Sequence, residues 1–258
     1  MAVVDKRLKV TELDFDNVKE NLKTFLKAQT EFKDYNFEGA GMNILLDVLA
    51  YNTHYLGFNA NMLANEMFLD SASLRSSVVS HAKTLGYEVT SSRAPIATVN
   101  VSLSTSADTK TMPAGTSFTT SIDGTDYSFV TIADVTSSNT GSAVPFDSVK
   151  IYEGTYVTST YTVDSSNVDQ KFLLNDSRAD TSTLTVKVQN SSSDTTTTTY
   201  TKATDITQLS STSTVYYLQE TDSGLHEVYF GDGVVSKAVS DGNLIKLQYV
   251  VTNRDDAN

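Results

Sequence analysis

Side chains that could carry out chemistry are few in this sequence and stand apart from one another. The three histidines are His54, His81 and His226, and none belongs to an HExxH segment or pairs with a second histidine at the short spacing of a zinc site. No cysteine is present, which excludes cysteine nucleophiles, cysteine-bound zinc and disulfides. Ser76 and Ser77 have no neighbouring base or oxyanion turn. We therefore expect a protein that is not an enzyme, with no catalytic residue, metal or cofactor, and with its histidines on a surface or at an interface.

Two acidic motifs are better explained by local structure than by ligand binding. Phe230-Gly231-Asp232-Gly233 offers one carboxylate, whereas calcium takes about six to eight oxygen ligands. The motif also lacks the lysine and the following helix of a phosphate loop. Because Asp-Gly favours turns, we interpret it as a tight hairpin turn. Asp14 and Asp16 are interpreted as the start of a helix, where carboxylates accept hydrogen bonds from free N–H groups.

The composition narrows the choice of partners. The chain has 258 residues, a formal net charge of −12 and an isoelectric point near 4.6. An acidic chain lacks the basic face that neutralises nucleic-acid phosphates or anionic lipids. No segment reaches the roughly 18 consecutive apolar residues of a membrane span, and the N-terminal segment lacks the apolar run of a signal peptide. We expect no nucleic-acid partner, no membrane partner and folding in a cytoplasm.

The chain changes its pattern near residue 92. Apolar residues recur at helical spacing in residues 1–92, whereas Ser, Thr, Val and Tyr alternate in residues 93–258. Pro95 marks the switch, because the residue before a proline favours extended backbone. The sequence therefore predicts an α+β protein: a helical bundling region of about three helices over 1–92, then a mainly antiparallel, sandwich-like β domain over 93–258.

Two of the predicted helices are ordinary amphipathic helices. The first starts after Asp14 or Asp16 and runs for about four turns. The third covers about 74–85, with Ser71 or Ser73 as its N-terminal cap and Gly86 as its end.

The second predicted helix, about 43–65, is apolar on more than one side. Between Ala40 and Asn65 its only charged residue is Asp47, although a helix that faces water normally carries charges on one face. Its aromatic and aliphatic side chains, with two aromatic residues before it, belong either to the chain's own core or to a subunit interface. The interface candidates are Tyr35, Phe37, Leu45, Leu49, Tyr51, Tyr55, Leu56, Phe58 and Met62.

The second half contains signals for at least eight short strands. Asp123-Gly124 predicts a two-residue hairpin between the strand 117–122 and the strand that follows it. Ser and Thr dominate the segment 191–199, which we interpret as a surface loop or hairpin tip.

Several short motifs follow one another along nearly the whole chain. The first two are Phe37-Glu38-Gly39 and Leu49-Ala50-Tyr51-Asn52-Thr53, and the next is Leu74-Arg75-Ser76-Ser77-Val78-Val79. The last two are Tyr229-Phe230-Gly231-Asp232-Gly233 and Asp256-Ala257-Asn258. In this order they resemble the N-terminal part of the large baseplate wedge subunit, gene product six, of T-even (T4-like) contractile-tail phages. The Phe-Gly-Asp-Gly turn also resembles the wider baseplate J-like family, whereas residues 102–210 match by strand pattern only.

This resemblance implies a structural component of the virion's tail baseplate that is assembled in the host cytoplasm. Similar proteins stand as two copies per wedge with a second wedge protein and bundle their N-terminal helices. Their wedges form a ring around the tail hub that rearranges when the sheath contracts. The implied partners are a second copy of the chain, other baseplate wedge proteins, and hub or sheath-proximal proteins. In the family the chain continues beyond the motif that ends this sequence, so we expect a short version or the N-terminal part of a longer protein.

The residues leave other functions open. A Ser/Thr-rich β domain also suits an adhesin or a receptor-binding module, and an unrecognised hydrolase is a third possibility. The missing secretion signal and the apolar N-terminal helices favour the baseplate protein over both.

Overall fold

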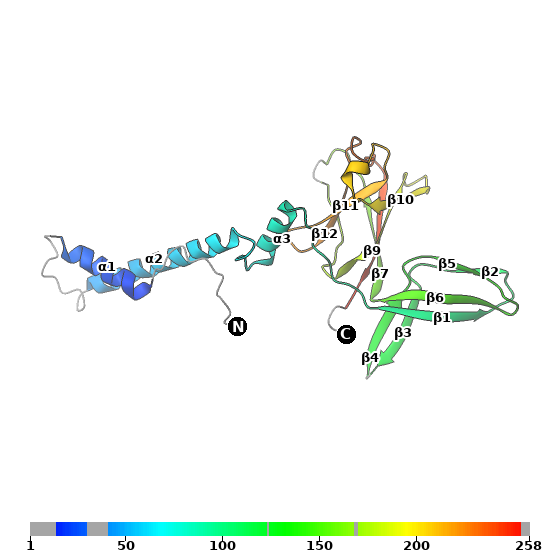
Figure 1. Cartoon of the computed structure of the whole chain (residues 1–258), viewed down its shortest axis with the longest axis horizontal. Coiled ribbons are helices and arrows are strands. Elements are labelled where there is room, and N and C mark those ends of the chain that lie inside the picture. Colours follow the sequence, from blue (N-terminus) through cyan, green and yellow to red (C-terminus); the bar gives the residue numbers. More distant parts are fainter. Residues whose placement is uncertain (1–13, 30–40, 123, 168–169, 254–258) are drawn as a thin grey trace. The chain divides into compact units, whose positions relative to one another are not determined.

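The computed structural model describes residues 14–29, 41–122, 124–167 and 170–253 of the chain (Figure 1). The chain divides into two compact units, with the division between Tyr87 and Glu88. The first unit is helical and the second is built of β strands, which confirms the α+β class. The domain boundary that we place near residue 92 stays a prediction.

The described part of the first unit contains three helices. They are α1 (Phe15–Lys27), α2 (Gly41–Glu66) and α3 (Arg75–Thr84). Asp14 caps α1 as predicted, because its carboxylate accepts a hydrogen bond from the Asp16 N–H at 2.7 Å. Gly86, with a φ of 76°, ends α3 as predicted, and the Tyr87 N–H then donates to the Ala82 carbonyl at 2.9 Å.

The predicted cap of α3 by Ser71 or Ser73 is wrong. The N-cap residue is Leu74, whose side chain makes no capping hydrogen bond. Glu66, the last residue of α2, takes this role instead: its carboxylate accepts from the Leu74 N–H at 3.2 Å and from the Ser73 N–H at 2.9 Å. A carboxylate from a preceding helix thus replaces the local serine, and it fixes the corner between α2 and α3.

Two smaller sheets open the β unit. One has four strands in the order β1-β6-β4-β3, and the other pairs β2 with β5. Opposite Ile122 in the pair β3–β4 lies Thr125, so the predicted hairpin is confirmed. The bounds are β1 (Ile96–Ser104), β2 (Thr109–Met112), β3 (Ser117–Ile122), β4 (Thr125–Val130), β5 (Val135–Ser138) and β6 (Ala143–Glu153).

The largest sheet has seven strands in the order β7-β13-β9-β10-β11-β12-β8. All neighbours are antiparallel except β10 and β11, which run parallel. The bounds are β7 (Thr155–Thr162), β8 (Phe172–Leu173), β9 (Ala179–Gln189), β10 (Thr197–Lys202), β11 (Val215–Glu220), β12 (His226–Phe230) and β13 (Leu244–Val251). A short 3-10 helix, η2 (Ile206–Gln208), lies between β10 and β11.

The core of the β unit lies on one face of each main sheet. On the seven-stranded sheet, Val186, Ile245 and Leu247 are fully buried. Val144 and Phe146 of β6 are buried in a second cluster on the four-stranded sheet. A third cluster joins residues of both sheets and contains Ala94, Val130 and Val250.

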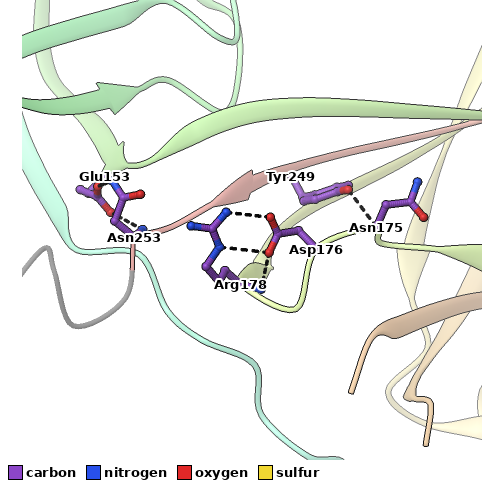
Figure 2. Close-up of polar contacts among 6 residues, drawn as sticks. All are labelled: Glu153, Asn175, Asp176, Arg178, Tyr249 and Asn253. Atoms are coloured by element: carbon purple, nitrogen blue, oxygen red, sulfur yellow. Dashed lines mark hydrogen bonds and ion pairs between the residues drawn. The ribbon is translucent and has the colours of Figure 1, made fainter. Parts of the chain in front are cut away.

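A buried carboxylate ties the end of β6 to the end of β13. Glu153 has no exposed surface, and its carboxylate accepts hydrogen bonds from Thr252 Oγ1 at 2.9 Å and Asn253 Nδ2 at 2.7 Å. Figure 2 shows the side chains of Glu153 and Asn253 facing each other. A carboxylate out of water needs such donors, because an unpaired one is costly to bury.

The turn after Glu153 requires glycine. Gly154 has a φ of 123°, and a Cβ atom added to it would lie 2.2 Å from the Val251 carbonyl oxygen. Only a residue without a Cβ lets β6 and β13 approach this closely.

Candidate assembly interface

Helix α2 uses one narrow stripe for contacts within the chain. The buried residues of this helix are Leu46, Ala50 and Gly57, which lie on one side. Helix α1 packs against α2, and Lys19 of α1 forms an ion pair with Asp47 of α2. The small side chains of Ala50 and Gly57 suit a close approach of another backbone.

A second stripe of α2 is apolar, continuous and exposed. Its six members follow one another in alternating steps of four and three residues, which is the spacing of the a and d positions of a coiled coil. None is charged, and each keeps between 42% and 67% of its surface exposed, so no part of the described chain covers the stripe. We call this set the aromatic stripe: Ile44, Val48, Tyr51, Tyr55, Phe58 and Met62.

A third stripe lies one residue further along the helix, about 100° around its axis. It contains four leucines and two asparagines at the same alternating steps. The leucines keep between 53% and 68% of their surface exposed. We call this set the leucine stripe: Leu45, Leu49, Asn52, Leu56, Asn59 and Leu63.

All the predicted interface residues on α2 lie on these two exposed stripes. Tyr51, Tyr55, Phe58 and Met62 belong to the aromatic stripe, and Tyr51 stacks on Tyr55 with ring centroids 6.1 Å apart. The other three, Leu45, Leu49 and Leu56, belong to the leucine stripe. In the described structure none of the seven is in the chain's own core. Tyr35 and Phe37 lie outside the described residues, and the interface role of all nine stays a prediction.

The corner after α2 is held by polar contacts. Hydrogen bonds from the side chain and N–H of Ser73, and from the side chain of Ser77, lower the pKa of the Glu66 carboxyl to about 2. His81 of α3 lies 2.8 Å from the Glu66 carbonyl oxygen through its Nε2 atom. These contacts set the direction of the chain at the end of both exposed stripes.

The acidic residue of the Phe-Gly-Asp-Gly motif has a local structural role. The Asp232 carboxylate accepts from the backbone N–H groups of Val234 and Val235, which lowers its pKa. The Phe-Gly-Asp-Gly motif is therefore a tight turn, but the prediction that it forms a hairpin is wrong, because β12 pairs with β11 and β8 and not with the next strand. Within the described ranges no three His, Asp or Glu side chains cluster as metal ligands.

A membrane-spanning helix has to be both long and apolar. None of the described helices meets both requirements, α2 included.

The sequence matches two family models of the phage baseplate. Residues 14–87 match the helical domain of gp6-like baseplate wedge proteins, and residues 159–254 match the third domain of bacteriophage baseplate wedge protein gp6. The first match contains all three described helices, and the second contains most of the seven-stranded sheet. These domains define the class: structural proteins of the phage tail baseplate, which is part of the virion.

A similar protein of known identity belongs to the same class. Baseplate wedge protein gp6 of Enterobacteria phage T4 is 31% identical over 264 residues, which cover 95% of this chain and 39% of that protein. The chain thus spans about two fifths of the length of the relative that it matches. The chain belongs to the gp6-like baseplate wedge proteins.

Proposed function

We propose that this chain is a non-enzymatic building block of a baseplate wedge and that helix α2 assembles it with other chains. The aromatic stripe carries the proposal. It is a run of six exposed apolar side chains at coiled-coil spacing, without a charge and without cover in the described chain.

Burial is the physical reason for assembly. Covering one large apolar side chain contributes about 1.5–3 kcal/mol. A helix that leaves such a stripe in water forgoes this stabilisation until another helix covers it. The absence of charge on the stripe removes the repulsion that normally keeps exposed helices apart.

The two stripes indicate more than one neighbour. A two-stranded coiled coil uses a single seam on each helix, whereas α2 has two seams about 100° apart besides the one that packs on α1. We therefore propose that α2 is the inner helix of a bundle, with a second copy of the chain on one stripe and another wedge protein on the other.

The finer assembly is part of the same proposal. Membership of the gp6-like family supports a wedge that joins a ring around the tail hub, with hub or sheath-proximal proteins as further contacts. Helix interfaces that have two discrete packings would let this ring rearrange on sheath contraction.

Light scattering on the full chain tests the helix interface. We expect a mass above the monomer that rises with concentration. Tyr51→Asp and Leu56→Asp each place a charge on one stripe and should shift the mass toward the monomer, and both should block incorporation into particles. Thr53→Asp is the control, because Thr53 lies on the side of α2 opposite the aromatic stripe.

A sharp monomer mass for the unsubstituted chain over a wide range of concentrations contradicts the proposal. Normal incorporation of the Tyr51 and Leu56 variants does so as well. Far-UV circular dichroism of each variant checks that the β unit remains folded.

A further inference from the structure

Strand β7 is an edge of the seven-stranded sheet that lacks the usual protection. Its pairing with β13 runs without a shift from Thr155 opposite Val251 to Thr162 opposite Leu244. No strand of the described chain pairs with its other side. Residues 155–162 contain no charged residue and no proline, the devices that commonly prevent pairing at a sheet edge.

A hydrogen bond at the end of β7 shows to which side each backbone N–H and C=O group of this strand points. The Val163 N–H donates to the Asn243 carbonyl at 2.8 Å, so Val163 faces β13. Because N–H and C=O groups alternate sides along a strand, Tyr156, Thr158 and Thr160 direct theirs away from β13. No hydrogen bond joins these groups to another residue in the described part of the chain.

A side-chain amide already occupies the next position on this edge. Gln170 donates from Nε2 to the Thr162 carbonyl at 2.7 Å, and its Oε1 accepts from the Asp164 N–H at 2.9 Å. The Gln170 amide thus bonds the Thr162 C=O and the Asp164 N–H, as the N–H and C=O of one residue do in a neighbouring parallel strand. The edge is therefore competent to pair with an amide, and Gln170 ends the free stretch at Thr162.

At the other end of the free stretch, the outward N–H group is also hydrogen-bonded already. The Gly154 N–H donates to the Ser128 carbonyl of β4 at 2.8 Å. Between the two closed ends, the outward backbone groups of residues 156–160 remain, and Thr158 lies at their centre.

We propose that the free edge of β7 joins two copies of this chain, which pair antiparallel about a two-fold axis at Thr158. In this register Thr158 lies opposite its own counterpart, and Tyr156 lies opposite the other copy's Thr160. All outward groups between the two closed ends are then paired, and the outer faces of the two sheets are continuous.

Charge and side-chain shape favour a second copy as the partner. The chain has a net charge of −12, but the uncharged edge lets two acidic copies meet without like charges opposite each other. Thr158 and Thr160 are exposed, and β-branched residues of this kind pair well across strands.

The contact is small, and it rests on the proposed function. About six backbone hydrogen bonds do not hold two chains together by themselves. Bundled α2 helices would hold the two copies at a high effective concentration, so that the edges pair as a second contact.

A single introduced cysteine tests the pairing in the full chain, which has no cysteine of its own. Across a hydrogen-bonded antiparallel pair the Cα atoms lie about 5.5 Å apart, within the range of about 4.4–6.8 Å that a disulfide spans. We expect Thr158→Cys to give a covalent dimer as the main product of mild oxidation.

Two further cysteine variants serve as controls for Thr158→Cys. Thr199→Cys places the thiol on the inner strand β10, at an exposed threonine opposite Lys187 of β9, and should yield at least tenfold less dimer. Thr160→Cys lies two residues from the axis and should yield little dimer too. Equal yields at all three positions, or a dimer through Thr160 alone, would overturn the proposal.

Light scattering of the reduced samples separates the two proposals. An oligomer without a Thr158→Cys disulfide overturns the edge contact and leaves the helix interface standing. A Thr158→Cys disulfide in a chain that is otherwise monomeric supports the edge and contradicts the helix interface. A monomer without the disulfide contradicts both.

Discussion

The helical unit and the β unit treat their apolar residues in opposite ways. In the described chain most buried apolar residues belong to the β unit, whereas most large apolar residues that remain exposed belong to α2 and the segment after it. The β unit has its core within one chain, and most of its Ser and Thr residues are at least partly exposed. The helical unit leaves two apolar stripes of α2 exposed in the described chain, and by our proposal other chains cover them.

This difference separates stability from assembly. We expect a substitution in the β core to act on folding and a substitution on the stripes of α2 to act on association. The two effects are measurable independently, because one depends on protein concentration and the other does not.

The largest expected effect comes from a matched pair of leucines. Leu247→Ala removes a side chain with no exposed surface and should lower the free energy of unfolding by about 2–5 kcal/mol. Leu56→Ala removes a side chain that is 60% exposed and should change the same free energy by less than about 0.5 kcal/mol in dilute solution. Urea unfolding followed by far-UV circular dichroism measures both.

The concentration dependence completes this test. Leu56→Ala should weaken self-association, and Leu247→Ala should not as long as the chain is folded. Equal losses of stability for the two variants would contradict the division between the units.

A smaller loss is expected at the turn between β6 and β7. Gly154→Ala places a Cβ atom against the Val251 carbonyl oxygen in a backbone conformation that side chains rarely adopt. We expect a loss of about 1–3 kcal/mol from the strained backbone, with the overlap adding to it. Gly141→Ala is the control, because Gly141 has a φ of 136° but has no other atom within 4 Å of the added Cβ. If the two variants lose equal stability, the close approach of the strands is not what requires glycine.

The smallest effect concerns the corner after α2. The pKa of Glu66 is lowered from 4.5 to about 2. The stabilisation of the α3 start by the ionised carboxylate is therefore complete above pH 4.5 and is lost as the pH falls toward 2. We expect the backbone amide resonances of Ser73 and Leu74 to shift over this range, with a midpoint near pH 2. In Glu66→Gln this shift should disappear, whereas Glu20→Gln on α1 should preserve it. A midpoint near 4.5 in the unsubstituted chain would show that the carboxylate does not cap α3.

The sequence predicts the elements better than their contacts. The helical spacing of α2 and the Asp-Gly turn after β3 indicate structures that form locally, and both are present. Val18 and Phe25 stand seven residues apart and so lie on one face of α1, yet Val18 is buried and Phe25 is 65% exposed. Periodicity shows which residues share a face, but it does not show how wide a stripe the neighbouring helix covers.

Contacts between distant residues were beyond prediction. Glu66 caps α3 from the preceding helix, and Glu153 is buried against residues 252 and 253, about a hundred positions later in the chain. The parallel pairing of β10 with β11 and the free edge of β7 likewise depend on strand order, which alternation does not fix. Unlike these distant contacts, the two exposed stripes of α2 can be read from the sequence, because their members recur in alternating steps of four and three residues.

The Glu153 contact has a mechanical consequence. β13 is an inner strand with β7 and β9 on its two sides, so a pull along its axis has to shear two ladders at once. Thr252 and Asn253 follow β13 directly, and their hydrogen bonds to Glu153 join them to the end of β6. A force applied at Asn253 is therefore shared between β6, through the Glu153 carboxylate, and the start of β9, through the hydrogen bond from the Thr252 N–H to the Arg178 carbonyl. The buried Glu153 side chain is thus one of the points where tension would pass from one sheet to the other.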